Sequence, residues 1–531
     1  MSNYVRPIPG TAFLTTPSEV IPVPTPSTSP DDPLNWSKRR KLVSMMCMSL
    51  FTLSSGVCTA SIYSILVPIS LQTNVSLSTL NQGTGYMFLF LGLGCLFWQP
   101  IGQQYGKRLV YIVSLLLTVA SQVWAAHAHN TSAHWIGSKI FQGFVQAPIE
   151  SLCEVTISDV FFEHERGRWI GLYAFMLMFS NYIAPVIAGP IADGQGWQWV
   201  LYWGAVFCGV VSIILFFLCE ETNWTRGADF KEEVVMTPFG GTGVAAGLAA
   251  LEEEDKKSSA ASNNSVANGS VISIHQKTYW QRLSLLDKPR PMMLWTMFVR
   301  PFKLVTYPAI VYSGFLYGTG LIFFNILNAT ASLIFSAEPY NFSATNVGLT
   351  YLSPAFVSGV LGWGAGHLSD FIKVWLARRN RGVSESEHRL WILLVYLILV
   401  PPSLMIWGFG ASRGFNPGLL ILAMGLIGGS GTVCATASVT YAIDSYRDIA
   451  SDSMVTLIII RNLVGFCVSY GITDWVTNEG LEKCFGEATG LCVACILPMF
   501  AVIWFGKKWR VKTKERYWQM VDESRRSGMA F

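Results

Sequence analysis

Residues 146–167 read QAPIESLCEVTISDVFFEHERG, and they continue an apolar run that starts at Trp135. Glu150 and Glu154 lie inside this run, one helical turn apart. A charged carboxylate is expensive in lipid, so such residues usually face the interior of a helix bundle or a water-filled cavity. The stretch therefore predicts a membrane helix with one polar face, surrounded by other helices.

The composition of the whole chain is typical of a protein that crosses a membrane many times. Of its 531 residues, 51% are hydrophobic and only 13% are charged, whereas a soluble protein carries about a quarter. A membrane-spanning helix needs about 20 mostly apolar residues. Twelve stretches meet that requirement: 42–67, 79–101, 109–128, 135–160, 169–191, 200–219, 305–332, 346–370, 390–410, 417–443, 453–475 and 489–506.

We expect an all-α membrane protein made of two six-helix halves, with both termini in the cytoplasm. Lys and Arg concentrate in the loops that share one side if the helices alternate, and the positive-inside rule assigns that side to the cytoplasm. Tails and loops rich in Pro, Ser and charge bury too little apolar surface to fold. The expected parts are a disordered N-terminal tail (1–41), a first bundle (42–221), a mostly disordered central loop (222–300), a second bundle (301–510) and a C-terminal tail (511–531).

Several classes of function are disfavoured by the sequence. The net charge of +4 follows from the loop cations and is no evidence for a nucleic-acid partner. The eleven Cys show no metal-ligand spacing, and the expected spans hold no enzyme motif, so we predict no cofactor, no metal site and no enzyme. Asn74, Asn130 and Asn341 begin N-x-S sequons in expected outer loops and are candidate glycosylation sites.

Short strings along the chain carry a family resemblance. They are DDPLNWSKRRK (31–41), APIESLCEVTISDVFFEHERG (147–167), RPFKL (300–304), GHLSDF (366–371), YAIDSY (441–446) and RNLVGF (461–466). Together they resemble the major facilitator superfamily, in its twelve-helix drug:proton antiporter branch. More closely, they are similar to fungal members related to the yeast histidinol and polyamine permease. The resemblance implies a transporter of two related halves with a substrate site between them.

The chain departs from the family pattern at three places. Gln103 stands where the loop between helices 2 and 3 usually has an acidic residue, so we expect the first half to lack the usual charge-relay lock, which Asp370 keeps in the second half. The helix-4 motif has Lys139 in place of the usual Arg. The helix-5 antiporter motif keeps Pro185 and Gly189 but has alanine at two glycine positions.

Helix 4 carries the leading candidates for transport. Lys139 and Glu150 are eleven positions apart, which places them about 20° apart around a helix, and Gly143 and Ala147 share that face. Glu154 follows one turn later. We predict that Lys139, Glu150 and Glu154 couple protons or bind a charged substrate. The alternative is a structural ion pair with Lys139 or Arg461.

Three more charged residues are candidates for a gate or for fixed ion pairs. Arg461 lies in expected helix 11 about as deep as Glu150, and a guanidinium stays charged, so it needs a partner. Asp370 and Asp444 end helices 8 and 10. Candidates for lining a cavity, each with plain packing as the alternative, are Tyr63, Asn181, Tyr182, Tyr312, Tyr317, Asn325 and Tyr441.

The sequence favours a proton-driven transporter of a small organic molecule. The antiporter branch favours efflux of a drug or fungal metabolite, whereas the closer resemblance and Glu150 favour uptake of cationic amines such as polyamines. A non-transporting sensor on the same fold is a third alternative. The expected partners are the substrate, protons and the lipid bilayer. We expect a monomer in the plasma membrane, with the vacuolar membrane as the alternative.

Overall fold

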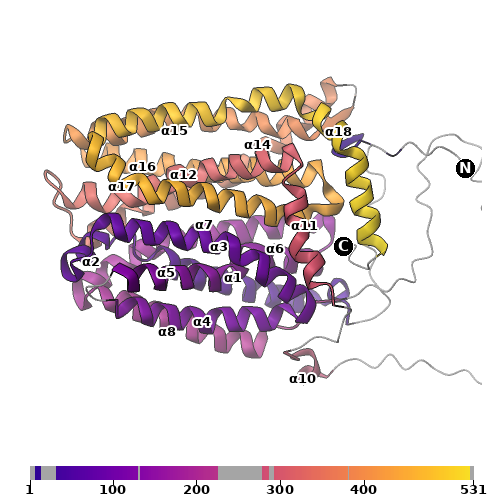
Figure 1. The fold of residues 1–531 in the computed structure, drawn as a ribbon, viewed down its shortest axis with the longest axis horizontal. Coiled ribbons are helices and arrows are strands. Elements are labelled where there is room, and N and C mark those ends of the chain that lie inside the picture. Colours follow the sequence, from indigo (N-terminus) through magenta and orange to yellow (C-terminus); the bar gives the residue numbers. More distant parts are fainter. Residues whose placement is uncertain are drawn as a thin grey trace, which may run out of the picture.

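The protein is described by a computed structural model that places residues 6, 8–13, 31–128, 132–224, 278–285, 292–380 and 382–526. These residues form a bundle of long helices that run nearly parallel (Figure 1). Nine helices of the described residues are long and apolar enough to cross a membrane. The predicted all-α class is therefore confirmed, with one addition: a small sheet of two strands.

The first part of the chain forms one side of the bundle, drawn in indigo to magenta in Figure 1. A short 3-10 helix, η1 (Pro33–Asn35), precedes its long helices. These are α1 (Lys38–Ala60), α2 (Leu66–Thr73), α3 (Leu77–Tyr105), α4 (Lys107–Ala126), α5 (Ser132–Gln146), α6 (Pro148–Val160), α7 (Glu163–Gln195) and α8 (Trp197–Leu218).

The later part of the chain forms the opposite side, drawn in pink to yellow, except for its first short helix, which lies beside α8 on the first side. Its elements are α10 (Tyr279–Arg282), α11 (Leu294–Leu304), α12 (Pro308–Ser336), α13 (Ala344–Thr350), α14 (Leu352–Arg379), the 3-10 helix η2 (Ser386–Ile392), α15 (Leu393–Ser412), α16 (Pro417–Ser445), the 3-10 helix η3 (Arg447–Ile449), α17 (Ala450–Ile496) and α18 (Pro498–Arg526). Within α17, Gly480 has φ +75° and divides two helical segments. The strands β1 (Thr11–Phe13) and β2 (Val383–Glu385) pair with each other.

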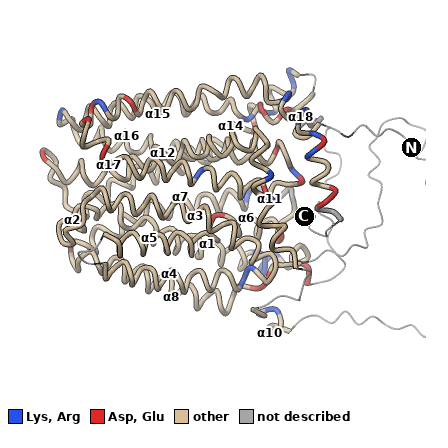
Figure 2. The backbone as a smooth tube through the Cα atoms, viewed as in Figure 1, with Lys and Arg blue, Asp and Glu red and all other residues tan. Residues whose placement is uncertain are grey.

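Charged residues gather toward the ends of the bundle and are sparse along its middle (Figure 2). We call the end where α1 begins the basic end, since Lys107, Arg389 and Lys507 lie there, and the opposite one the far end. Asn74 and Asn341 are exposed at the far end, with φ values of 55° and 50°. Asn130 lies outside the described residues.

Helix 4 is interrupted, contrary to the single run expected over 135–160. Pro148 begins α6 and has no backbone N–H, so it cannot donate to the carbonyl of Phe144 one turn earlier. The indole of Trp98 donates to that carbonyl instead, at 2.8 Å. The break makes Glu150 a first-turn residue of a new helix, where the helix dipole favours a negative charge.

Both expected tails contain regular structure. Within 1–41, Thr11–Phe13 form β1, η1 follows and α1 already begins at Lys38, where the Ser37 hydroxyl caps the helix. At the other end of the chain, α18 continues to Arg526, well past residue 511. Most of the expected central loop, residues 225–277 and 286–291, lies outside the described residues.

The two sides of the bundle meet closely at the far end. A Cβ on Gly189 of α7 would lie 2.4 Å from the carbonyl oxygen of Ala344, and one on Gly348 of α13 would lie 2.3 Å from that of Pro185. The Asp193 carboxylate also accepts the backbone N–H of Thr345, at 2.8 Å. The predicted helix-5 motif therefore forms a backbone-to-backbone contact that closes the far end.

A valine at position 348 tests this contact. The added side chain meets backbone rather than a movable side chain, so we expect Gly348→Val to force α7 and α13 apart. Overpacking of this kind costs about 1–3 kcal/mol, and the midpoint of thermal unfolding in detergent should fall. Gly209→Val is the control, since a Cβ there has no atom within 4 Å. Equal midpoints for the two variants would contradict the contact.

Candidate functional site

A cavity of about 80 Å³ lies between the two sides of the bundle. One water molecule needs roughly 10–15 Å³, so the space holds several waters as it stands. Residues of α1, α3, α6, α7, α12, α16 and α17 form its wall: Gly56, Thr59, Phe88, Ile149, Glu150, Leu177, Met178, Asn181, Tyr182, Tyr317, Gly320, Leu321, Phe324, Gly428, Gly431 and Arg461.

Two opposite charges face each other in this wall. The Arg461 guanidinium forms an ion pair with the Glu150 carboxylate, and each side chain is only 6% exposed. Asn462 donates to the second carboxylate oxygen at 2.8 Å and accepts from Arg461 at 3.2 Å. This buried cluster joins α6 of one side to α17 of the other.

The pair leaves bonding capacity for a ligand. The Nε atom of Arg461 is buried and has no hydrogen-bond partner among the described residues. The Tyr317 ring lies 4.6 Å below the guanidinium, where it can stabilise a cation. A substrate ammonium could replace Arg461 at Glu150, and a proton on Glu150 would release Arg461. The site can therefore exchange one charge for another.

The residues that the sequence placed on one face of helix 4 contact different neighbouring helices. Gly143 and Ala147 pack closely against α3, while Glu150 faces α17. Glu154 is half-buried and does not line the cavity. Among the described residues, Glu154 forms no ion pair and no hydrogen bond.

Lys139 is separated from both carboxylates. It is completely buried, its ammonium donates to Gln142 at 2.8 Å, and it lies 5.1 Å from the Trp135 ring. Gln142 donates in turn to Gln146 at 3.5 Å, and Thr59 donates to the same oxygen at 2.8 Å. Thr59 is part of the cavity wall, so Lys139 reaches the cavity through a chain of amide and hydroxyl groups.

Three of the predicted cavity residues do line it: Asn181, Tyr182 and Tyr317. The Tyr182 hydroxyl donates to the carbonyl of Gly428 at 2.7 Å and so crosses between the two sides. Phe324 packs against the Tyr182 ring at 5.9 Å between centroids. These rings form the wall nearest the closed far end.

Four other predicted cavity residues are packed elsewhere. Tyr63 lies against the edge of the Phe324 ring at 6.1 Å, outside the cavity wall. Asn325 donates to the carbonyl of Gly465 at 3.4 Å, which is a helix–helix contact. Tyr312 and Tyr441 pack edge to face at 6.5 Å. Plain packing, the alternative considered for each, describes these residues.

Sequence reasoning missed most of the apolar and small wall residues, including Thr59, Phe88 and Phe324. The one available signal is the glycine-dense run 425–431, a pattern typical of close helix packing or of a bend. Two of its glycines, Gly428 and Gly431, border the cavity. An apolar side chain in a membrane helix shows no sign in the sequence of facing a cavity rather than lipid.

Comparison with known proteins decides the family. The sequence model described as Major Facilitator Superfamily matches residues 45–470, most of the chain. The protein belongs to the major facilitator superfamily. Family members of this kind are transporters, so the chain is an integral membrane transporter and not a member of an enzyme family.

Similar transporters are found across fungi. An uncharacterized MFS-type transporter of Schizosaccharomyces pombe is 26% identical, with 98% of this chain and 95% of that protein covered. Protein HOL1 of Saccharomyces cerevisiae is 27% identical, with 96% and 93% covered. The MFS antiporter QDR3 of Candida albicans is 21% identical, with 80% and 72% covered.

Solved structures agree on the fold. A partially occluded inward-open conformation of the xylose transporter XylE from E. coli superposes with a TM-score of 0.58 at 11% identity. The superposition covers 87% of this chain and 99% of XylE. At that identity the likeness is one of fold alone.

The transporter places Asp370 and Asp444 at the basic end, away from the cavity wall. Arg389 of η2 bridges them, at 2.8 Å to Asp370 and 2.7 Å to Asp444. Lys373 of α14 also pairs with Asp444, at 2.5 Å. The cluster ties the ends of α14 and α16 to η2.

The first half of the transporter has a charge cluster of its own, although Gln103 replaces the usual acid. Lys107 pairs with Asp159 at the end of α6. The Glu221 carboxylate accepts the backbone N–H groups of Lys107 and Arg108, at 3.2 and 3.1 Å, at the start of α4. Position 103 itself carries no charge, and carboxylates from other elements supply the charged contacts at this end.

A mutant cycle tests whether Glu150 and Arg461 depend on each other. Arg461→Leu alone leaves a buried carboxylate without its cation, and breaking a buried pair costs about 3–5 kcal/mol. Adding Glu150→Gln removes the stranded charge, so the double variant should recover most of the lost stability. The measurement is the thermal unfolding midpoint of the native chain, both single variants and the double variant. Strictly additive effects would show that the two side chains are uncoupled.

Proposed function

We propose that the protein is a proton-coupled secondary transporter that exports a small organic molecule, such as a drug or fungal metabolite, by alternating access. The observation that carries this proposal is the buried Glu150–Arg461 pair, which joins the two halves in the wall of a cavity between them. Ionisable groups inside a membrane mark ion and substrate pathways. The similarity to QDR3, an antiporter, supports export as the direction of transport.

The proposal includes a topology of twelve spans with the basic end in the cytoplasm. Nine helices qualify as spans by length and composition, and three further spans come from interrupted or merged helices. These are α5 with α6, α13 with α14, and the second segment of α17 continued by α18. The Arg6–Asp522 pair, at 2.9 Å, holds residues near both termini at the basic end, as an even number of spans requires.

In this topology the cavity belongs to a state that is closed to the outside. The α7–α13 contact at Gly189 closes the far end, and Tyr182 and Phe324 lie between that contact and the cavity. Protonation of Glu150 would remove the charge that holds Arg461, and so weaken one link between α6 and α17. A proton gradient would then shift the balance between the two access states, because the states bind the proton differently.

Cationic amines are a second candidate class of substrate, moved inward. The observation in their favour is that Glu150 faces the cavity together with the aromatic rings of Tyr317, Tyr182 and Phe324. Carboxylates and aromatic faces together recognise ammonium groups. Binding at Glu150 requires the amine to compete with Arg461, so only a cation that also gains ring contacts would be held.

Proton-driven flux in membrane vesicles separates these alternatives. The probes are a labelled polyamine and a neutral fluorescent drug, and the variant is Glu150→Gln. Loss of a charged hydrogen-bonding group removes about 1.5–3 kcal/mol, so gradient-driven flux should fall by about tenfold or more. The control is Glu482→Gln, which makes the same chemical change at an exposed carboxylate that pairs only with groups near the far end.

Each outcome has a separate meaning. If export of the neutral drug depends on Glu150, the antiporter proposal is supported. If gradient-driven uptake of the amine depends on Glu150, the second candidate is supported. Flux that continues unchanged in Glu150→Gln would refute the role of Glu150 in coupling. An absence of gradient dependence for every probe would refute proton drive itself.

A further inference from the structure

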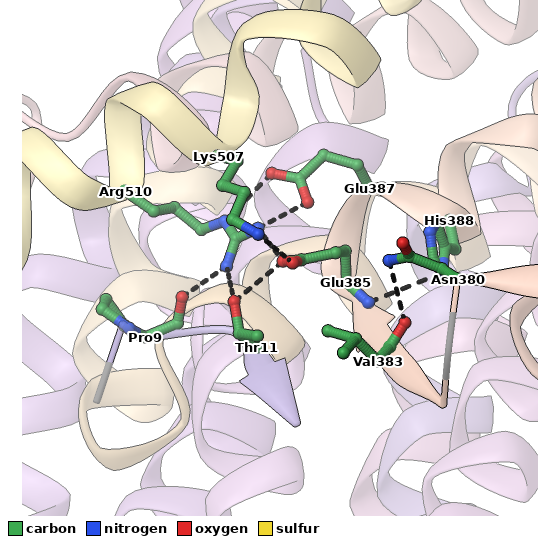
Figure 3. Close-up of polar contacts among 9 residues, drawn as sticks. All are labelled: Pro9, Thr11, Asn380, Val383, Glu385, Glu387, His388, Lys507 and Arg510. Atoms are coloured by element: carbon green, nitrogen blue, oxygen red, sulfur yellow. Dashed lines mark hydrogen bonds and ion pairs between the residues drawn. The ribbon is translucent and has the colours of Figure 1, made fainter. Parts of the chain in front are cut away.

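The beginning of the chain forms an extended contact with the second half at the basic end (Figure 3). β1 pairs antiparallel with β2, with Thr11 opposite Glu385 and Ala12 opposite Ser384. The carbonyl of Gly10 also accepts the backbone N–H of Ser386 at 3.2 Å. Strand addition of this kind is a general mode of peptide recognition. Here the peptide is part of the same chain.

The contact is centred on one guanidinium. Arg510 of α18 is completely buried and donates to Glu387 at 2.9 and 2.6 Å and to Glu385 at 2.7 Å. Its remaining nitrogen donates to the carbonyl of Pro9 and to the hydroxyl of Thr11. An arginine has five N–H donors, and these bonds use all of them. Two of the five therefore depend on the N-terminal segment.

The N-terminal segment also donates a hydrogen bond to the Glu385 carboxylate, which faces this guanidinium, from the hydroxyl of Thr11. Burial alone would raise the pKa of Glu385, but hydrogen bonds from Arg510, Lys507 and Thr11 hold its pKa below the usual value. Glu385 is therefore negatively charged at neutral pH and balances the positive charge of Arg510. Without Thr11, both buried groups lose a hydrogen bond.

The shape of the contact admits only glycine at position 10. Gly10 has φ +78°, a conformation that other residues rarely adopt. A Cβ there would lie 2.7 Å from Arg510, 2.8 Å from the Ser386 hydroxyl and 3.0 Å from the Cα of Ser445. The segment is thus fitted between η2, α18 and the end of α16. We call Glu385, Ser386, Glu387, Ser445 and Arg510 the N-terminal docking site.

The docking site is continuous with the charge cluster of the second half. Its residues Ser386 and Glu387 open η2, the 3-10 helix whose Arg389 bridges Asp370 and Asp444. We infer that residues 8–13 are a built-in peptide ligand of the second half, and that their docking holds η2 so that Arg389 stays between Asp370 and Asp444. In that role, the segment is a positioning element for the cluster at the basic end.

Peptide binding tests the docking directly, without any transport substrate. The purified chain lacking residues 1–13 should bind a fluorescein-labelled peptide of residues 1–13 saturably, measured by fluorescence anisotropy. The full-length chain should bind it at least tenfold more weakly, because its own segment occupies the site. A peptide carrying Gly10→Val should also bind at least tenfold more weakly. Absence of binding to the truncated chain, or equal binding of both peptides, would overturn the inference.

Hydrogen–deuterium exchange tests the positioning role in the full-length chain. Gly10→Val should raise deuterium uptake across β2 and η2, whereas Arg6→Ala should not. Arg6→Ala is the matched control because Arg6 lies two residues before the docked segment and pairs with Asp522 on the surface, outside the docking site. Unchanged uptake in Gly10→Val would overturn the positioning role.

Cross-linking keeps the inference testable if the truncated chain does not fold. In a Cys467→Ser background, which removes a surface thiol, Ala12→Cys with Ser384→Cys should form a disulfide. The pair Ala12→Cys with Val383→Cys is one residue out of register, and its yield of disulfide should be at least tenfold lower. Equal yields from both pairs would overturn the docked register.

Discussion

The pairing of Glu150 with Arg461 is the contact on which the arrangement of this transporter depends. Each side chain is nearly inaccessible to water, and each would be costly to bury without the other. Asn462 satisfies the remaining carboxylate oxygen, so the cluster is neutral and largely hydrogen-bonded. Because one charge comes from α6 and the other from α17, the cluster both joins the halves and defines the wall of the cavity between them.

The local backbone prepares this pairing. Pro148 interrupts helix 4, Trp98 takes over the carbonyl that the proline cannot bond, and Glu150 becomes a first-turn residue of α6. The start of a helix favours a negative charge. Lys139 lies eleven residues before Glu150, about 16 Å along a helix axis, and amide and hydroxyl groups link it to the cavity. The two charges of helix 4 therefore lie at different depths and have different neighbours.

The two ends of the bundle are held by different physical means. At the far end, α7 and α13 approach until backbone touches backbone, a contact without charged pairs at its centre. At the basic end, carboxylates and cations from separate elements pair around Arg389, Lys107 and Arg510. Close packing of small residues is effective in lipid, where the hydrophobic effect does not drive helices together.

How much could be read from the sequence differs between fold and site. Apolar length and charge composition were enough for the all-α membrane class, and the location of the helices followed, since a bilayer admits few alternatives to long helices. Glu150, Arg461, Tyr182 and Tyr317 were also identified from their type and depth, because polar side chains in apolar runs are conspicuous. The docked strand β1 was missed, since a three-residue strand in a polar, Pro-rich tail has no periodicity to reveal it.

The sequence by itself determined which stretches form long apolar helices and which charged residues lie within them, because the bilayer selects strongly for apolar side chains along each helix. Only the tertiary structure decided which of those charges meet. Glu150 and Arg461 lie 311 positions apart in the chain. The sequence alone left either Glu150 or Glu154 free to pair with either Lys139 or Arg461. Their pairing depends on how α6 and α17 rotate and approach, which is set by packing between helices and leaves no trace in either helix alone.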